Sequence, residues 1–219
     1  MTNMTSEERS AANGDTLADA DSLEDQKERR APVELVAGRF VRGDHGHASL
    51  PTALSAAARR MDPTRPARAA ATLVPILESA DIDCARMTDA RLLRWAIVVH
   101  ALAVLSGTAG APVCSRKRPA GRVMAACGYS EHRFARLLTA RGEPLSAQVV
   151  RLARYLRAAG GVPLDLRAIA DLVLEDGEAN GLAERARLRL ARDYFGGARR
   201  ADDTAGGTAS DHELQQAAT

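Results

Sequence analysis

Aromatic residues, cysteine and lysine are all scarce in this 219-residue sequence, in which phenylalanine, tryptophan and tyrosine together make up 3%. The shortage of aromatic residues, combined with abundant alanine, leucine and arginine, favours helices over sheets. The chain is long enough for one ordinary domain or two small ones. We therefore predict an all-α protein.

The cysteines are Cys84, Cys114 and Cys127. Their odd number and the lack of C-x-x-C spacing support neither a disulfide framework nor a zinc site. Cys114 and Cys127 also lack a histidine at a spacing typical of nucleophilic catalysis. We expect them to be small buried hydrophobic side chains, and we expect no active site, no metal and no cofactor.

No long hydrophobic run is present either. The longest, residues 92–105, is interrupted by Arg94 and His100 and is too short to span a bilayer. The first residues contain no apolar segment of the kind found in a secretion signal. We expect a cytoplasmic protein without membrane contact.

Positive charge is concentrated in the middle of the chain, although the formal net charge is only +2. Residues 1–30 contain eight acidic and four basic side chains, and residues 196–219 contain four and two. Residues 31–195 therefore carry 24 bases and 16 acids, a net charge of +8. Only two of the bases in the chain are lysines. Because a guanidinium binds phosphate oxygens bidentately, this composition suits a nucleic-acid partner, and it equally fits the codon bias of a GC-rich genome.

The chain divides into four parts by composition. Residues 1–30 form an acidic tail and residues 197–219 a second tail, and both are too poor in large apolar residues to fold. Between them we predict an N-terminal helical domain over residues 31–112 and an antiparallel helical bundle with a basic face over residues 113–196. The predicted helices span residues 35–41, 50–60, 67–79, 90–106, 119–127, 130–140, 145–159, 165–174 and 183–195.

The helix predicted at 145–159 separates arginine from apolar residues. At about 100° per residue, Arg151, Arg154 and Arg157 lie on one side and Val149, Leu152 and Leu156 on the other. A solvated face would look the same on any single helix. Two further elements of the bundle repeat the pattern, which lowers the weight of that explanation: Arg133 and Arg136 on the preceding helix, and the cluster Arg116, Lys117, Arg118 and Arg122 before and within the helix at 119–127.

The order of several segments resembles a known family. These segments are PAGRVMAACGYSEHRFARLL (119–138), VRLARYLRAAGGVPLDLRAIADLVL (150–174) and RLRLARDYF (187–195), preceded by RGDHG (42–46) and LLRWAIVVHALA (92–103). Together they are similar to the small subunit of the type I-E CRISPR Cascade complex, the CasB family, over roughly residues 35–195.

The resemblance implies an all-helical, non-catalytic subunit of a surveillance complex guided by crRNA. Its partners would be the large subunit, the repeat-type backbone subunit and a second copy of itself. Its basic surface would contact guide RNA and target DNA, mainly the displaced non-target strand of the R-loop. Such a role fits the charge pattern, since strand exchange is nearly balanced in energy and backbone contacts can tip it.

Three candidate binding residues follow from matching positions of the family pattern: Arg122, Arg133 and Arg154. The others are inferred from charge and helix face alone: Arg116, Lys117, Arg118, Arg136, Arg151 and Arg157. The family often has an arginine pair where this chain has residues 50–52, so an N-terminal contribution is not supported there, although Arg59 and Arg60 follow one helix later.

Aromatic side chains that could stack on bases are few in the bundle. Phe134 and Phe195 are expected in the core, and Tyr155 is expected at the border of the arginine side. Contact with phosphates, without base readout, is therefore favoured.

Two other groups carry weaker hypotheses. Residues 44–47 (DHGH) contain possible metal ligands, but no further cysteine or carboxylate completes a set, and a loop turn is favoured. Asp165 is expected to cap a helix, and Asp171, Glu175 and Asp176 are expected to face solvent or another subunit.

Two alternatives to the Cascade role stay open. The helices around residue 128 could form a helix-turn-helix of a free-standing DNA-binding regulator. The chain could also be a structural scaffold whose arginines meet acidic protein partners.

Overall fold

The computed structural model describes residues 32–41, 49–107 and 113–197. Contacts group residues 1–32 separately from residues 33–219. Apart from Gly197, which ends the last helix, both predicted tails lie outside the described residues, as does the DHGH loop, and the cores of all the predicted helices lie inside them.

Helices make up most of the described part, which confirms the all-α prediction. Every predicted helix is present, with ends shifted by a few residues. Besides the first helix (residues 32–39) and the last helix (residues 182–197), these are α2 (Thr52–Arg60), α3 (Pro66–Glu78), α4 (Asp89–Ser106), α5 (Ala120–Ala126), α6 (Glu131–Thr139), α7 (Gly142–Ala158) and α8 (Arg167–Leu174).

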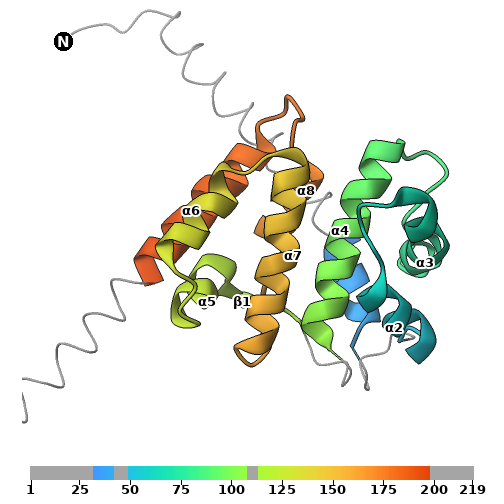
Figure 1. Cartoon of the computed structure of the whole chain (residues 1–219), viewed down its shortest axis with the longest axis horizontal. Helices are drawn as coiled ribbons and strands as arrows, with labels where there is room; N and C mark the ends of the chain where they lie inside the picture. Colours follow the sequence, from blue (N-terminus) through green and yellow to red (C-terminus); the bar gives the residue numbers. More distant parts are fainter. Residues whose placement is uncertain (1–31, 42–48, 108–112, 198–219) are drawn as a thin grey trace, which may run out of the picture. The chain divides into compact units, whose positions relative to one another are not determined.

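Helix α4 is the centre of the folded part. Its residues from Trp95 to Ser106 are buried, apart from the half-buried Val104, because other helices cover it on several sides. It packs against α2 and α3 on one side and against α7 and α8 on the other (Figure 1). Thr88 caps it by accepting a hydrogen bond from the backbone N–H of Arg91. Buried residues on both sides of the predicted boundary at residue 112 belong to one hydrophobic cluster, and the two-domain division stays a prediction.

A pair of short strands was not predicted. Strand β1 (Cys114–Pro119) runs parallel to β2 (Leu164–Asp165), with an irregular register between Cys114 and Pro119. The segment CSRKRP contains no β-branched or aromatic residue, so local preference does not favour a strand here. The distant β2 segment holds it in place, and the backbone N–H of Leu164 also donates to the carbonyl of Val113 at 3.1 Å.

Helix α5 crosses the last helix at very close range. A Cβ on Gly121 would lie 2.5 Å from the backbone nitrogen of Tyr194 and 2.7 Å from the Cβ of Asp193. Only glycine fits at such a distance. The crossing places Arg122, the next residue, on the exposed side of α5.

A buried ion pair joins the turn before the last helix to the α6–α7 connection. Arg187 donates from Nη2 to Oδ1 of Asp176 at 2.9 Å, and both side chains are less than a tenth exposed. The same guanidinium donates to the carbonyls of Leu138 at 3.0 Å and Ala140 at 3.2 Å. The other oxygen of Asp176 accepts from the backbone N–H of Gly142 at 2.6 Å. One acid and one arginine thereby hold the end of α6 and the start of α7.

The prediction that Glu175 and Asp176 face solvent or a subunit is wrong. Their residues are 5% and 8% exposed, because α8 ends at Leu174 and the following turn points inward. Glu175 pairs with Arg91 of α4 at 3.0 Å. Asp165 is not the N-cap residue that the sequence predicted, because it lies in β2 and Leu166 is the N-cap of α8. Its Oδ1 still accepts from the backbone N–H of Arg167, the first residue of α8, at 3.1 Å.

Replacing Arg187 by methionine is expected to lower the free energy of unfolding by about 3–5 kcal/mol, since Asp176 would stay buried without its partner. Urea unfolding followed by circular dichroism measures the change. Arg192→Met, at an exposed position of the same helix, is the matched control and should change stability by less than about 0.5 kcal/mol. Equal stabilities of the two variants would contradict the importance of the ion pair.

His100 is a second buried polar group, and it makes stability depend on pH. The residue is 3% exposed, Nδ1 lies 3.0 Å from the carbonyl of Ala58, and Nε2 has no hydrogen-bond partner among the described residues. Burial lowers the pKa of His100, and the nearby charge of Arg154 acts in the same direction.

A histidine with a lowered pKa in the folded state takes up its proton more readily when unfolded. Its contribution to stability is therefore present above the unfolded pKa of about 6.5 and is lost as the pH falls from there towards the folded pKa. We expect wild-type protein to lose stability between pH 7.5 and pH 5.5 in urea unfolding, and His100→Leu to lose less over the same range. A variant with the full wild-type pH dependence would rule out His100 as the source.

Candidate nucleic-acid interface

Four of the predicted arginines lie exposed on two neighbouring helices. Arg133 and Arg136 belong to α6, and Arg151 and Arg154 belong to α7. We call these four residues the arginine row. None of their side chains forms a hydrogen bond or ion pair with another described residue, so their charges are available to a partner.

The apolar residues of both helices explain why these arginines point outward. On α6, Phe134 and Leu137 are buried. On α7, Val149, Leu152 and Leu156 are buried, which is the separation of faces that the sequence predicts. Because the apolar stripes pack into the core, the arginine positions between them are left at the surface.

Two tyrosines lie where the helices of the arginine row meet. Burial raises the pKa of Tyr129, and the positive charges of Arg133, Arg136 and Arg151 act in the opposite direction. Three arginines from two helices are therefore close to one buried phenol. Phosphate oxygens placed there would meet several positive charges at once.

Tyr155 borders the arginine row, as expected. The guanidinium carbon of Arg133 lies 5.5 Å from the centre of its ring, within the range of a cation–π contact. The hydroxyl of Tyr155 donates to the carbonyl of Cys127 at 2.8 Å, and its ring contacts Tyr129 edge-on at 5.1 Å. These contacts hold the α6 side of the row against α7.

Arg157 does not join the row, although it lies on the same predicted side of α7. It is half-buried and packs against two glycines at positive φ: a Cβ on Gly107 would lie 2.8 Å from its Nε, and a Cβ on Gly161 2.8 Å from its Nη1. Its charge therefore sits at the carboxyl end of α4, where Arg59 also donates to the carbonyl of Gly107 at 2.8 Å. Two guanidiniums at a helix C-terminus complement the helix dipole.

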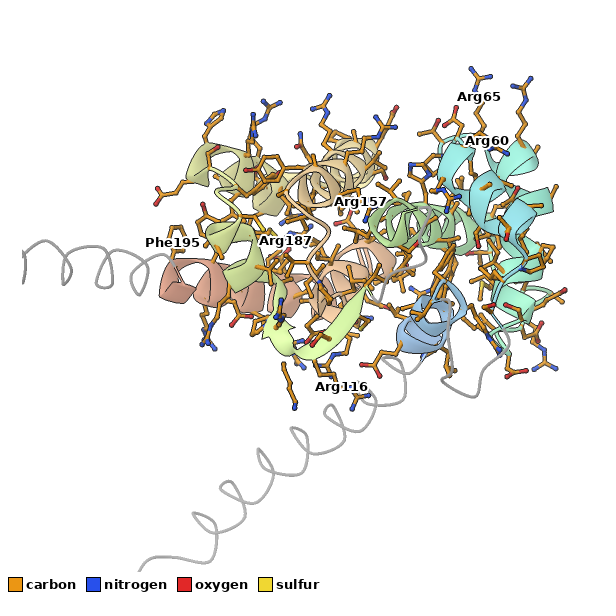
Figure 2. All side chains as sticks on the ribbon, turned by 90° about the horizontal axis from the view of Figure 1, so that it is seen from below. Arg60, Arg65, Arg116, Arg157, Arg187 and Phe195 are labelled. Carbon is orange, nitrogen blue, oxygen red and sulfur yellow. The ribbon has the colours of Figure 1, made fainter. Side chains whose placement is uncertain are left out.

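The predicted cluster before and within α5 is divided by the structure. Arg116 pairs with Glu34 of the first helix, with Nε 2.8 Å from Oε1, and Glu34 also lies 3.6 Å from Nε of Arg167. Figure 2 shows Arg116 at the edge opposite to that reached by the outward side chains of α6 and α7. Its charge is thus engaged within the protein, away from the arginine row.

The remaining three cations of that cluster surround a cavity of about 660 Å³. Lys117 and Arg118 come from β1 and Arg122 from α5. We call this space the β1–α5 cavity. Residues of α5 and of the turn that follows α7 also line it, and it is open to solvent.

Arg60 is a candidate that the sequence singled out only weakly. It is exposed at the end of α2, and Figure 2 shows it with Arg65 at the edge to which α6 and α7 also project outward side chains. The charge of Arg154 acts on the pKa of His100, and Nδ1 of His100 lies 3.0 Å from the carbonyl of Ala58 in α2. The Arg154 end of the arginine row therefore lies towards α2. Arg65 has a partner, because it lies 3.3 Å from Asp62.

Exposed apolar residues lie elsewhere on the bundle. Phe195 is 46% exposed, so its predicted place in the core is wrong, whereas Phe134 is buried as predicted. Phe195 directly follows the buried Tyr194 in the last turn of the last helix, so its side chain points away from the buried side of that helix. Leu188, seven residues earlier on the same helix, is 60% exposed.

Two further features, a cluster of metal-binding side chains and a bilayer-spanning helix, are absent from the described residues. No group of three or more histidine, cysteine, aspartate or glutamate side chains in this part of the chain could hold a metal ion. No helix within it is both long and apolar enough to cross a bilayer.

Comparison with known proteins bears on the same region. Curated proteins give no match, and solved structures give none. A family model described as CRISPR-associated protein Cse2 matches residues 55–195, well over half of the chain, and this range includes all nine predicted binding residues. The resemblance drawn from the sequence is confirmed: the chain belongs to the Cse2 family, the small subunits of the type I-E CRISPR Cascade complex.

Proposed function

We propose that this chain is a non-catalytic Cascade subunit that holds nucleic-acid backbone, and in particular the displaced non-target strand of the R-loop, in antiviral defence. One observation carries the proposal: arginines from α6 and α7 converge, without acidic partners among the described residues, around Tyr129 and Tyr155. Guide RNA and target DNA are the polyanions that a Cascade subunit meets in the cytoplasm.

The energetics of R-loop formation suit such a surface. The guide–target duplex is about as stable as the DNA duplex that it replaces, so small gains elsewhere decide whether the R-loop persists. Contacts between arginines and the phosphates of the displaced strand supply such a gain without reading its sequence. The four residues of the arginine row, with Lys117, Arg118 and Arg122, are the proposed contacts.

Arg116 and Arg157 have a different role in this proposal. Arg116 is paired with Glu34, and Arg157 lies against Gly107 and Gly161. We assign them to holding the first helix and the end of α4 in place, with no direct contact to nucleic acid.

Contacts with other Cascade subunits and with a second copy complete the proposal. A scaffold without direct nucleic-acid contact is the second candidate, and the exposed Leu188 and Phe195 favour it because exposed apolar side chains suit protein contacts. The two candidates differ in what the arginine row contacts.

Charge reversal in the assembled complex tests whether the arginine row holds the displaced strand. Arg133→Glu combined with Arg151→Glu should weaken the hold on the displaced strand by roughly ten- to a hundredfold, since two phosphate contacts become repulsions. Protection of the non-target strand from a single-strand nuclease measures the hold.

The matched control reverses two other exposed arginines, Arg86 and Arg192, with the same change in net charge. It should leave the protection unchanged. If the Arg133/Arg151 variant assembled normally and protected the strand as well as wild type, the scaffold would be the better proposal.

Binding of single strands by the full chain alone tests the same surface outside the complex. It should bind single strands of any sequence, with an affinity that falls as salt is added. The logarithmic salt slope of the Arg133→Ala/Arg151→Ala variant should be smaller by about 1.4, which is about 0.7 for each lost contact with a single strand. Fluorescence anisotropy of a labelled strand, recorded at salt concentrations from about 50 to about 300 mM, measures the slope. A strong preference for one duplex sequence would instead favour a helix-turn-helix regulator.

A further inference from the structure

The β1–α5 cavity differs chemically from the arginine row. Its rim carries Lys117, Arg118 and Arg122, and no acidic side chain lines it. Its floor is apolar and includes Val123, Ala126 and Ala159. The arginine row is a set of charges on helix surfaces, whereas the cavity combines charge with an apolar surface that is open to solvent on one side.

The charges on the rim are largely unused by the protein. The side chains of Lys117 and Arg118 form no hydrogen bond or ion pair with another described residue, in contrast to that of their neighbour Arg116. Burial raises the pKa of Asp193, and the positive charge of Arg122 opposes that rise. A bound anion would therefore find these cations available.

The cavity lies at the end of the path that the arginine row marks out along α7. Arg151, Tyr155 and Ala159 follow one another at intervals of four residues, each turned by about 40° from the one before, which places them on one side of the helix. From Arg151 to Ala159 the axial rise is about 12 Å, roughly two nucleotide steps of an extended strand. Tyr155 lies under Arg133, and its hydroxyl bonds to the carbonyl of Cys127, a residue that itself lines the cavity.

The shape and chemistry together match a nucleotide. The volume of about 660 Å³ is in the range of small-ligand sites. A nucleobase has two apolar faces and is joined to phosphates, so it can cover an apolar floor while the phosphates on either side meet cations at the rim. A phosphate backbone alone would leave the floor exposed to water.

We propose that the β1–α5 cavity is a nucleotide subsite, in which one unstacked base of a single strand rests on the apolar floor and its flanking phosphates contact Lys117, Arg118 and Arg122. The floor includes no side chain that could distinguish one base from another by hydrogen bonds, so any base is accepted. This inference rests on the proposed strand-binding function and adds to it a contact that depends on bases.

A test needs a readout at the cavity itself, and Cys127 supplies it. Cys127 is partly exposed and lines the cavity, whereas the partly exposed Cys84 lies far along the chain near α3 and serves as an internal reference. Full-length protein at low salt is alkylated with iodoacetamide in the presence of an oligothymidine strand, or of a strand of equal length made of abasic sugar phosphates. Mass spectrometry of peptides gives the labelling of each cysteine.

The expected result is that the oligothymidine strand suppresses labelling of Cys127 and leaves that of Cys84 unchanged. The abasic strand, at a concentration giving the same bound fraction, should leave both unchanged. The oligothymidine strand should also bind more tightly than the abasic strand, by about fivefold, since one base leaves water on binding.

A matched pair of variants checks the cavity independently. Ala159→Leu fills the cavity, and Ala158→Leu adds the same side chain one residue earlier, at an exposed position that does not line it. We expect Ala159→Leu to lose the fivefold preference for bases and to bind the abasic strand as wild type does, and we expect Ala158→Leu to keep the preference.

The outcomes separate the two proposals. Salt-sensitive binding that is equal for both strands, with Cys127 labelled throughout, would overturn the nucleotide subsite and leave the strand-binding surface standing. Lack of salt-sensitive binding by either strand would overturn both. If a peptide of alternating aspartate and leucine protected Cys127 better than the oligothymidine strand, the cavity would be a docking site for protein instead.

Discussion

The pairing of Arg187 with Asp176 is the interaction on which the rest of the basic surface depends. Two charged side chains are buried together, and their remaining hydrogen-bonding groups are used by the backbone at the end of α6 and the start of α7. A buried charge pair of this kind is stable only when its geometry is well satisfied, as it is here. Because it fixes where α6 ends and α7 begins, it also determines how the arginines of one helix lie relative to those of the other.

Arginine has two different functions in this protein, and the structure separates them. Arg91, Arg157 and Arg187 are turned inward, where carboxylates, carbonyls or glycines receive them. The arginine row is turned outward and has no acidic partner among the described residues. The net charge of the folded part therefore does not measure its attraction for nucleic acid, since much of it serves to hold helices together. What matters is the subset of charges left without partners and grouped on neighbouring helices.

Much of the helical arrangement could be predicted because it follows from local patterns. Apolar spacing and glycine positions predicted each helix to within a few residues, and they predicted the outward direction of Arg151 and Arg154. The predictions failed where distant segments decide. Strand β1 has no local preference for a strand and exists because β2 lies beside it. Glu175 and Asp176 look like surface acids, yet arginines from elsewhere in the chain draw them inward.

The sequence by itself determined the helices, the family and the presence of an arginine-rich surface, because all of these depend on the order and spacing of residues along the chain. Only the tertiary structure decided which arginines are free. Arg154 and Arg157 are one turn apart on the same side of α7, but Arg157 meets Gly107 and Gly161, and Arg154 meets none of the described side chains in a hydrogen bond or ion pair. Likewise, the cavity behind Lys117, Arg118 and Arg122 exists only because β1, α5 and the end of α7 are packed together. A partner for a charged side chain is a matter of position in space, and segments far apart in the chain supply it.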